Sequence, residues 1–191
     1  MRRGLEVSQM TRQISDLFVI DGEEYEGRGI TDSLVNPIEF GITPMMLHTA
    51  CYRGFVCRFS LDGAVRLTQL KVRSRVGTYP AIDGVLPHID PDSKIAKYDG
   101  LALEIQYSGH LHLGRDAIPE RYVHIGYAHL TEFRKVVKVT CELGVVTGIT
   151  DVSAEVALQR EALDKAIQAD PKAGYRAMWN VEVEVVHPKK K

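Results

Sequence analysis

The stretch Tyr52–Val72, YRGFVCRFSLDGAVRLTQLKV, decides how the chain is expected to fold. Apolar and polar residues alternate on both sides of a DG pair, which is typical of two antiparallel strands joined by a short turn. A two-residue turn would mix the two faces, because it would set Phe59 opposite Arg66. A three-residue turn, Leu61–Gly63, sets Phe59 opposite Val65 and gives one apolar and one polar face. Because a slip of one residue reverses every side chain, we expect this second register.

Three further alternating runs break at turn residues and predict more hairpins. The first turns at Asp21-Gly22, a pair suited to a two-residue type I′ turn that sets Ile20 opposite Glu23. The others turn at Ser108-Gly109 and near Leu143-Gly144. The chain is therefore expected to consist of successive hairpins over most of its length.

The character of the sequence changes after residue 150. Residues 153–170 carry apolar side chains at helical spacing, with Ser153 as the expected N-cap and Pro171 beyond the end. The apolar stripe expected to be buried is Val156, Leu158, Leu163 and Ile167. Residues 179–187, WNVEVEVVH, alternate again and predict a final strand.

Hairpins followed by a late helix define the expected fold class. It is α+β, with a mainly antiparallel β-sheet curled into a barrel-like or sandwich form. The chain of 191 residues is long enough for one well-cored domain. We expect a single domain over residues 1–191, with a β-rich core at 16–150 and the helix and C-terminal strand, 151–191, as an appendage.

Charge and composition narrow the function. The 24 basic and 25 acidic residues give a net charge of -1, so no overall field attracts nucleic acid or an anionic membrane. No run approaches the roughly 20 apolar residues of a membrane span, and the N-terminus lacks the apolar segment of a signal peptide. The three cysteines contain no CxxC pair, which argues against a disulfide framework and a thiolate zinc site. We expect a cytoplasmic protein without a cofactor.

The segment Ser108–Asp116, SGHLHLGRD, raises the question of a metal site. His110 and His112 share one face of a strand, and with Asp116 they could converge on one ion. The pattern resembles the first metal-binding motif of cupins, but here the acid is Asp rather than Glu and no second motif follows. The other interpretation is that the intervening leucines, Leu111 and Leu113, face the core while the histidines face solvent. We expect no bound metal.

Polar groups are dense in residues 114–129, GRDAIPERYVHIGYAH. Arg115, Asp116, Tyr122 and His124 lie on either side of a short link, and pairing of the flanking strands would bring them together. An arginine oriented by a carboxylate, with a tyrosine and a histidine, could bind an anionic ligand or perform acid–base chemistry. The alternative is an ion-paired turn between two strands.

Arg53 is the remaining candidate for ligand or partner binding. It precedes Gly54 in an alternating run, and a glycine there indicates a bulge or a close approach of the backbone. An arginine stacked on an aromatic ring is one interpretation of this segment. A salt bridge at a strand edge is the other.

Three segments, CYRGF, GHLHLGRD and YVHIG, together resemble a family of small uncharacterised bacterial proteins. In that family the patterns CxRG[YF], GxLxxGRD and YVHxG recur in this order, and the resemblance covers residues 18–150. It implies a compact bacterial cytosolic domain, and the two histidines of HLH are not part of the pattern. The positions that the resemblance marks are Arg53, Gly54, Gly114, Arg115, Asp116, Tyr122, His124 and Gly126.

The function expected from these observations is that of a non-catalytic binding or interaction domain. It would be an immunity-type or accessory-type protein that neutralises or accompanies another bacterial protein. Its partner would be a protein or a small anionic ligand. The alternative is a small-ligand enzyme, or a metal-binding β-barrel protein, that uses His110 and His112 or the region of Arg115, Asp116 and His124.

Overall fold

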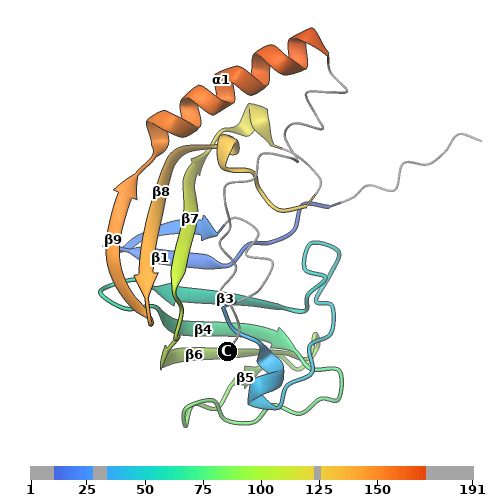
Figure 1. Cartoon of the computed structure of the whole chain (residues 1–191). Coiled ribbons are helices and arrows are strands. Elements are labelled where there is room, and N and C mark those ends of the chain that lie inside the picture. The colour runs from blue at the N-terminus through green and yellow to red at the C-terminus, as the bar shows by residue number, and fades with distance from the viewer. Residues whose placement is uncertain (1–10, 28–33, 123–125, 171–191) are drawn as a thin grey trace, which may run out of the picture.

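The structure is a computed structural model of the chain and describes residues 11–27, 34–122 and 126–170 (Figure 1). The elements in chain order are β1 (Leu17–Ile20), β2 (Glu23–Gly27), η1 (Pro37–Phe40), β3 (Phe55–Ser60), β4 (Arg66–Arg73), β5 (His88–Ile89), β6 (Ile95–Glu104), β7 (Gly109–Ala117), η2 (Pro119–Arg121), η3 (Leu130–Glu132), β8 (Phe133–Glu142), β9 (Val145–Asp151) and α1 (Ser153–Ala169). The three η elements are short 3₁₀ helices.

The strands form one sheet in the order β5-β6-β4-β3-β1-β2-β7-β8-β9. Neighbours run antiparallel except β1 and β3, which run parallel. Figure 1 shows two limbs: β3, β4 and β6 cross the lower part, while β7, β8 and β9 rise beside them toward α1. The mainly antiparallel sheet with a late helix is confirmed. Over the described residues the order does not return to its first strand, so this sheet is not closed and the barrel-like form is not confirmed.

The main core draws side chains from both limbs of the sheet. At its centre the rings of Phe18 and Phe59 stack with centroids 5.0 Å apart, and both residues are fully buried. Burial of a large apolar side chain contributes roughly 1.5–3 kcal/mol, so this shared core holds the limbs together. Other buried members of the core are Leu67, Leu70, Tyr98, Leu111, Leu113 and Val139.

The first and last hairpins have the predicted turns. Ile20 lies opposite Glu23 across Asp21-Gly22, and φ angles of 50° and 79° place both turn residues in the left-handed region. Leu143-Gly144 joins β8 to β9 in the same way, with φ angles of 47° and 84°. These are the positions that a type I′ turn requires.

The β3–β4 hairpin keeps the predicted faces but not the predicted register. Phe59 lies opposite Leu67 rather than Val65, a shift of two residues that leaves the apolar face intact. The Val65 N–H instead donates to the carbonyl of Gly144 at 2.8 Å, so the loop is drawn toward the β8–β9 turn. Farther along, Thr68 is an extra residue in β4 and forms a bulge.

The predicted hairpin at Ser108-Gly109 is wrong. β6 lies between β4 and β5, whereas β7 lies between β2 and β8. The link between them bonds to the β8–β9 turn: the Gly144 N–H donates to the Tyr107 carbonyl and the Leu143 N–H to the Ser108 hydroxyl, both at 2.8 Å. Alternation indicates a strand and its buried face, but it does not specify which strand lies beside it.

The helix α1 begins at Ser153, but Ser153 is not its N-cap. The N-cap is Val152, which offers no side-chain acceptor. The Ser153 hydroxyl accepts the N–H of Val136 at 3.0 Å, and the Ser153 N–H donates to the Asp151 carboxylate at 2.9 Å. The serine therefore fastens the start of α1 to β8.

The apolar stripe of α1 is narrower than predicted. Val156 and Leu163 are buried, but Leu158 is 68% exposed. Arg160 holds the next turn of the helix by donating to the carbonyls of Thr131 and Phe133 at 2.9 and 2.5 Å. The final strand predicted at 179–187 lies outside the described residues. Within the described ranges, no helix is long and apolar enough to cross a membrane.

Candidate functional site

A hollow opens where β2 and β7 separate. The two strands pair at two positions, Glu26 with Gly114 and Gly27 with Leu113. Beyond these pairs β2 stays bonded to β1 and β7 to β8, and the hollow between them has a volume of about 430 Å³. Each wall is therefore held by a strand ladder on its far side. The charged residues of the lining are Glu23, Glu24, Glu26, Arg115 and Asp116.

Arg115 crosses the hollow from β7 to β2. Its guanidinium forms an ion pair with Glu23 and lies 3.6 Å from the carboxylate of Asp116. The same group lies 5.6 Å from the centre of the Tyr25 ring. Partial desolvation opposes the positive charge, but the contacts with Tyr25 and the two carboxylates outweigh it and raise the pKa of Arg115. The cation predicted from the sequence to bind a ligand is thus engaged by the protein's own side chains.

The carboxylates of the hollow outnumber its guanidinium groups. Glu24 pairs with Arg58, and Glu26 with Arg12, in addition to the pair made by Arg115. The four carboxylates of the lining thus face three guanidinium groups, those of Arg12, Arg58 and Arg115. This leaves one negative charge in excess. The side chains of Glu23, Glu24 and Asp116 are 58%, 49% and 54% exposed. Their oxygens favour a cationic group over the anionic ligand expected from the sequence.

The floor of the hollow is rigid at two positions. Gly114 packs directly on the Phe133 ring, where a Cβ atom would lie 2.3 Å from a ring carbon. Asp116 has φ of 58°, a left-handed conformation that non-glycine residues seldom adopt. That conformation sets the direction of the Asp116 carboxylate, at some cost in backbone strain.

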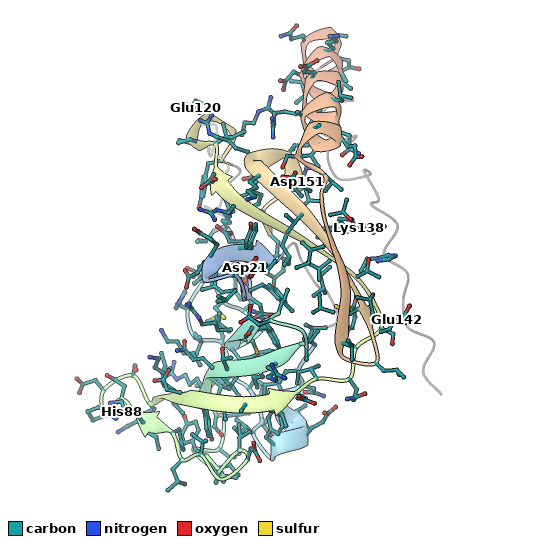
Figure 2. The ribbon with its side chains drawn as sticks, turned by 90° about the vertical axis from the view of Figure 1, so that its left-hand side faces the viewer. Asp21, His88, Glu120, Lys138, Glu142 and Asp151 are labelled. Carbon is teal, nitrogen blue, oxygen red and sulfur yellow. The ribbon has the colours of Figure 1, made fainter. Side chains whose placement is uncertain are left out.

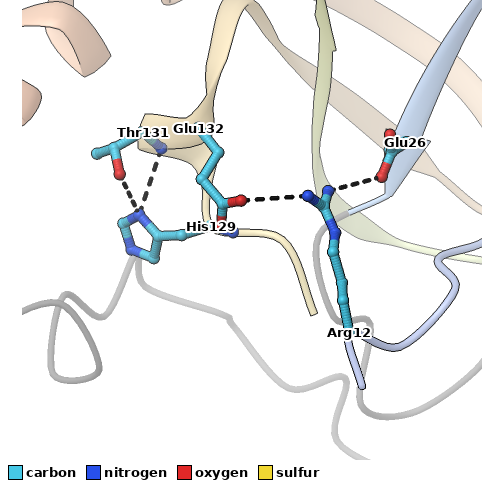
Figure 3. Close-up of polar contacts among 5 residues, drawn as sticks. All are labelled: Arg12, Glu26, His129, Thr131 and Glu132. Atoms are coloured by element: carbon cyan, nitrogen blue, oxygen red, sulfur yellow. Dashed lines mark hydrogen bonds and ion pairs between the residues drawn. The ribbon is translucent and has the colours of Figure 1, made fainter. Parts of the chain in front are cut away.

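Beside the hollow, Arg12 lies between two carboxylates (Figure 3). It donates to Glu26 at 3.1 Å and to Glu132 at 3.2 Å, and the side chains of Arg12 and Glu132 are 11% and 4% exposed. Glu132 also accepts the N–H of His129 at 2.7 Å, while the Thr131 N–H donates to His129 Nδ1 at 3.3 Å. We name Arg12, Glu26 and Glu132 the Arg12 clamp, which joins the N-terminal segment to β2 and η3.

The structure separates the candidates of residues 114–129. Arg115 and Asp116 line the hollow, but Tyr122 lies against the Arg12 clamp, with its ring centre 4.9 Å from the Arg12 guanidinium carbon. His124 lies outside the described residues. Sequence reasoning missed the clamp because its members are far apart in the chain. The one local signal was the H-x-x-E spacing of His129 and Glu132, which resembles a capping box.

Arg53 is part of the scaffold. Two of its nitrogens donate to Asp16, one of them at 2.9 Å, and its Nε donates to the Phe55 carbonyl at 2.8 Å. The Asp16 side chain is 4% exposed and also accepts the Cys57 N–H at 2.6 Å. The guanidinium carbon lies 4.8 Å from the centre of the Phe55 ring, so both the ion pair and the aromatic stacking considered from the sequence are present.

The cysteines are buried and form no disulfide. Burial raises the pKa of the Cys51 and Cys57 thiols and raises the pKa of Cys141 to about 11. A thiol with a raised pKa stays protonated near neutral pH and is a poor nucleophile. These residues act as small apolar side chains.

His110 and His112 lie on the polar side of β7, whereas Leu111 and Leu113 are buried. His110 Nδ1 lies 3.2 Å from the Thr140 hydroxyl, and His112 lies opposite Lys138. An ammonium group beside an imidazole opposes the binding of a metal cation. Among residues 11–27, 34–122 and 126–170, no group of three His, Cys, Asp or Glu side chains is placed to hold a metal ion.

Comparisons with models of protein families, with curated proteins and with solved structures found no match. The resemblance drawn from the three short segments therefore stays a prediction.

Proposed function

We propose that the protein is a non-catalytic binding domain that receives a basic side chain of a partner protein in the hollow between β2 and β7. The observation that carries this proposal is the set of exposed carboxylates, Glu23, Glu24 and Asp116, in a hollow whose walls are fixed by strand ladders. Such a site is complementary to a lysine or arginine at little reorganisation cost.

The neighbouring Arg12 clamp supports the same chemistry. There the protein itself seats a guanidinium between the carboxylates of Glu26 and Glu132, next to the Tyr122 ring. The hollow repeats this arrangement in part, because its own Arg115 lies beside the Tyr25 ring and the carboxylates of Glu23 and Asp116. A cation held by carboxylates beside an aromatic ring gains both Coulombic and cation–π attraction.

The wider role that we propose is the one expected from the sequence. A small cytosolic domain of this kind would act as an immunity-type or accessory-type protein, which neutralises or accompanies another bacterial protein. Its partner would present a basic segment to the hollow. Because the carboxylates are exposed, we expect the binding to weaken as ionic strength rises.

The test is a titration of the ¹⁵N-labelled protein with the peptide acetyl-Arg-Arg-Arg-amide at low ionic strength. We expect chemical-shift changes concentrated at residues 22–26 and 114–117. Glu24→Gln with Asp116→Asn should weaken binding at least five-fold, and asparagine tolerates the left-handed backbone at position 116. A matched pair, Asp83→Asn with Glu142→Gln, removes the same charge from exposed positions outside the lining and should bind like the wild type.

Two results would overturn the proposal. One is a set of shift changes scattered over the surface, with equal weakening in both double variants. The other is stronger binding of inorganic phosphate or of acetyl-Glu-Glu-Glu-amide at the same residues. That outcome would restore the anionic ligand expected from the sequence.

A further inference from the structure

The guanidinium of Arg115 lies where the basic side chain of a partner would be expected to bind. It is paired with the carboxylate of Glu23 and lies beside the Tyr25 ring, 5.6 Å from the ring centre. A basic side chain that enters the hollow would be attracted to the same two groups, because each of them attracts a cation. The hollow is therefore filled in part by a residue of the chain itself.

Arg12 and Arg115 are held in different ways. Arg12 and its partner Glu132 are both largely buried. By contrast, a quarter of the Arg115 side chain is exposed, as are more than half of the Glu23 and Asp116 side chains with which it pairs. An ion pair between exposed groups contributes little, because water solvates the separated charges nearly as well. Arg12 is therefore a fixed part of the scaffold, whereas the contact of Arg115 with Glu23 can be exchanged for another.

The walls of the hollow do not depend on the side chain of Arg115. Glu23 pairs with Ile20 of β1, and Arg115 pairs with Lys135 of β8, so each backbone is held by a ladder on its far side. Asp116, the next residue in the chain, has its carboxylate 3.6 Å from the Arg115 Nε. A guanidinium that leaves Glu23 can thus remain beside a carboxylate, while the strands on both sides stay paired.

Figure 2 shows the side of the molecule on which these strand ends lie. Asp21 belongs to the β1–β2 turn, whose second residue, Gly22, lines the hollow, and Glu120 follows the end of β7. Both lie on the same side of the molecule, whereas Lys138 of β8 lies on the other side. A side chain of a partner that enters between these strand ends would meet Arg115.

We propose that Glu23 and Tyr25 form a guanidinium subsite, which Arg115 fills in the absence of a partner and which an arginine of the partner takes on binding. This inference rests on the proposed function of the hollow, and it specifies which basic residue the hollow receives. A guanidinium is planar, so it can lie on the Tyr25 ring and donate two hydrogen bonds to the Glu23 carboxylate. The ammonium group of a lysine lacks this shape.

Occupancy of the subsite by Arg115 has a measurable consequence. A ligand binds only the fraction of molecules in which its site is open, so the internal guanidinium lowers the apparent affinity for an external one. Removal of the Arg115 guanidinium should therefore strengthen binding of an arginine peptide. If Arg115 instead served to hold the walls of the hollow, the same change would weaken binding.

The test compares Arg115→Gln, Arg115→Lys and Lys135→Gln by titration with acetyl-Arg-Arg-Arg-amide at low ionic strength. Lys135→Gln is the matched control, because it removes the same charge opposite Arg115 but outside the lining of the hollow. We expect Arg115→Gln to bind at least five-fold more tightly than the wild type, and Lys135→Gln to bind within two-fold of it. Arg115→Lys keeps the charge and loses the planar shape, so its affinity should lie between those of the wild type and Arg115→Gln.

Two further measurements address the displacement and the preference for a guanidinium. The Nε–H signal of Arg115 in the ¹⁵N-labelled wild type is assigned by its loss in Arg115→Gln. It should move when the unlabelled arginine peptide is added, because Arg115 leaves Glu23. Arg115→Gln should also bind the arginine peptide at least three-fold more tightly than acetyl-Lys-Lys-Lys-amide.

The outcomes separate this inference from the proposed function. Suppose that the peptide shifts residues 22–26 of the wild type, while the Arg115 Nε–H signal stays fixed and Arg115→Gln shows no gain in affinity. The subsite would then be overturned, and the binding of a basic side chain in the hollow would stand. The absence of binding in the wild type and in all three variants would overturn the proposed function and this inference with it.

Three other results would also overturn the subsite. Equal gains in Arg115→Gln and Lys135→Gln would reduce the effect to the removal of one charge. Weaker binding by Arg115→Gln would show that Arg115 supports the walls of the hollow. Equal affinities of Arg115→Gln for the arginine and lysine peptides would show that the hollow does not select a guanidinium.

Discussion

Arg53 and Asp16 form a two-fold hydrogen-bonded ion pair beneath the start of β3, and both side chains are largely removed from solvent, at 18% and 4% exposure. Asp16 precedes β1, and Arg53 precedes β3, so the pair ties together the two strands that run parallel in this sheet. The Cys57 N–H, which also donates to Asp16, belongs to β3 itself. The pair therefore fixes how β3 enters the sheet.

Arg53→Ala should destabilise the protein strongly. Removing the guanidinium leaves the Asp16 carboxylate buried without its cation, which typically costs about 3–5 kcal/mol. Arg66→Ala is the matched control, because Arg66 pairs with Glu104 at 3.2 Å with side chains 39% and 59% exposed. Such an exposed pair contributes about 0–1 kcal/mol. Urea denaturation measures both, and similar losses in the two variants would contradict this account of Asp16.

Gly114→Ala should distort the hollow as well as the fold. The new methyl group would overlap the Phe133 ring, which is 1% exposed and cannot swing into solvent. We expect a loss of about 1–3 kcal/mol, the usual cost of overpacking, and weaker binding of the arginine peptide. At Gly148 an added methyl group has no atom within 4 Å. Gly148→Ala should therefore change the free energy of unfolding by no more than about 0.5 kcal/mol.

Leu163→Ala and Leu158→Ala test how α1 is docked. The sequence placed both leucines in one apolar stripe, but Leu163 is 7% exposed and Leu158 is 68% exposed. Truncation of the buried leucine should cost about 2–5 kcal/mol, whereas the exposed one should cost less than about 0.5 kcal/mol. The two variants change the same atoms in the same helix. Equal losses in thermal or urea denaturation would show that α1 does not dock on the face that the structure describes.

Turns could be predicted from the sequence where their conformation depends only on the residues of the turn itself. Asp21-Gly22 and Leu143-Gly144 adopt left-handed φ angles in two-residue turns. Glycine takes such angles without strain and aspartate is enriched there, so the glycine marks each turn, while Leu143 adopts its angle at some cost. The close approach inferred at Gly54 is also confirmed, because a Cβ atom there would lie 2.5 Å from the Met45 carbonyl oxygen. In each case the residue type itself carries the constraint.

Pairing between distant segments could not be predicted in this way. The β3–β4 loop and the β6–β7 link both bond to the Leu143-Gly144 turn, which lies about 40–80 residues later in the chain, and this contact overrides the local hairpin geometry. The Arg12 clamp is equally non-local. Alternation predicted the buried face of strands such as β3 and β7, because that face is marked by residue types within one segment, whereas strand order depends on which apolar faces meet.

Stability should fall at alkaline pH because of Cys141. Burial raises the pKa of the folded thiol to about 11, whereas an exposed thiol in the unfolded chain ionises near about 8.5. Between these values the unfolded state releases a proton that the folded state keeps. The stabilising contribution is therefore complete below about pH 8.5 and is lost as the pH rises toward 11.

The comparison of the wild type with Cys141→Ala isolates this contribution. The alanine variant is less stable at pH 7.5 because a buried side chain is shortened, but it lacks the ionisation at this position. Its free energy of unfolding should fall less steeply between pH 9 and pH 10.5, by up to about 1.4 kcal/mol per pH unit. Cys51 and Cys57 are present in both proteins and contribute equally to the two curves.

Urea denaturation at several pH values measures the slopes of the two curves. Parallel curves would mean that Cys141 ionises in the folded state as readily as in the unfolded one, and the burial of this thiol in the main core would be contradicted.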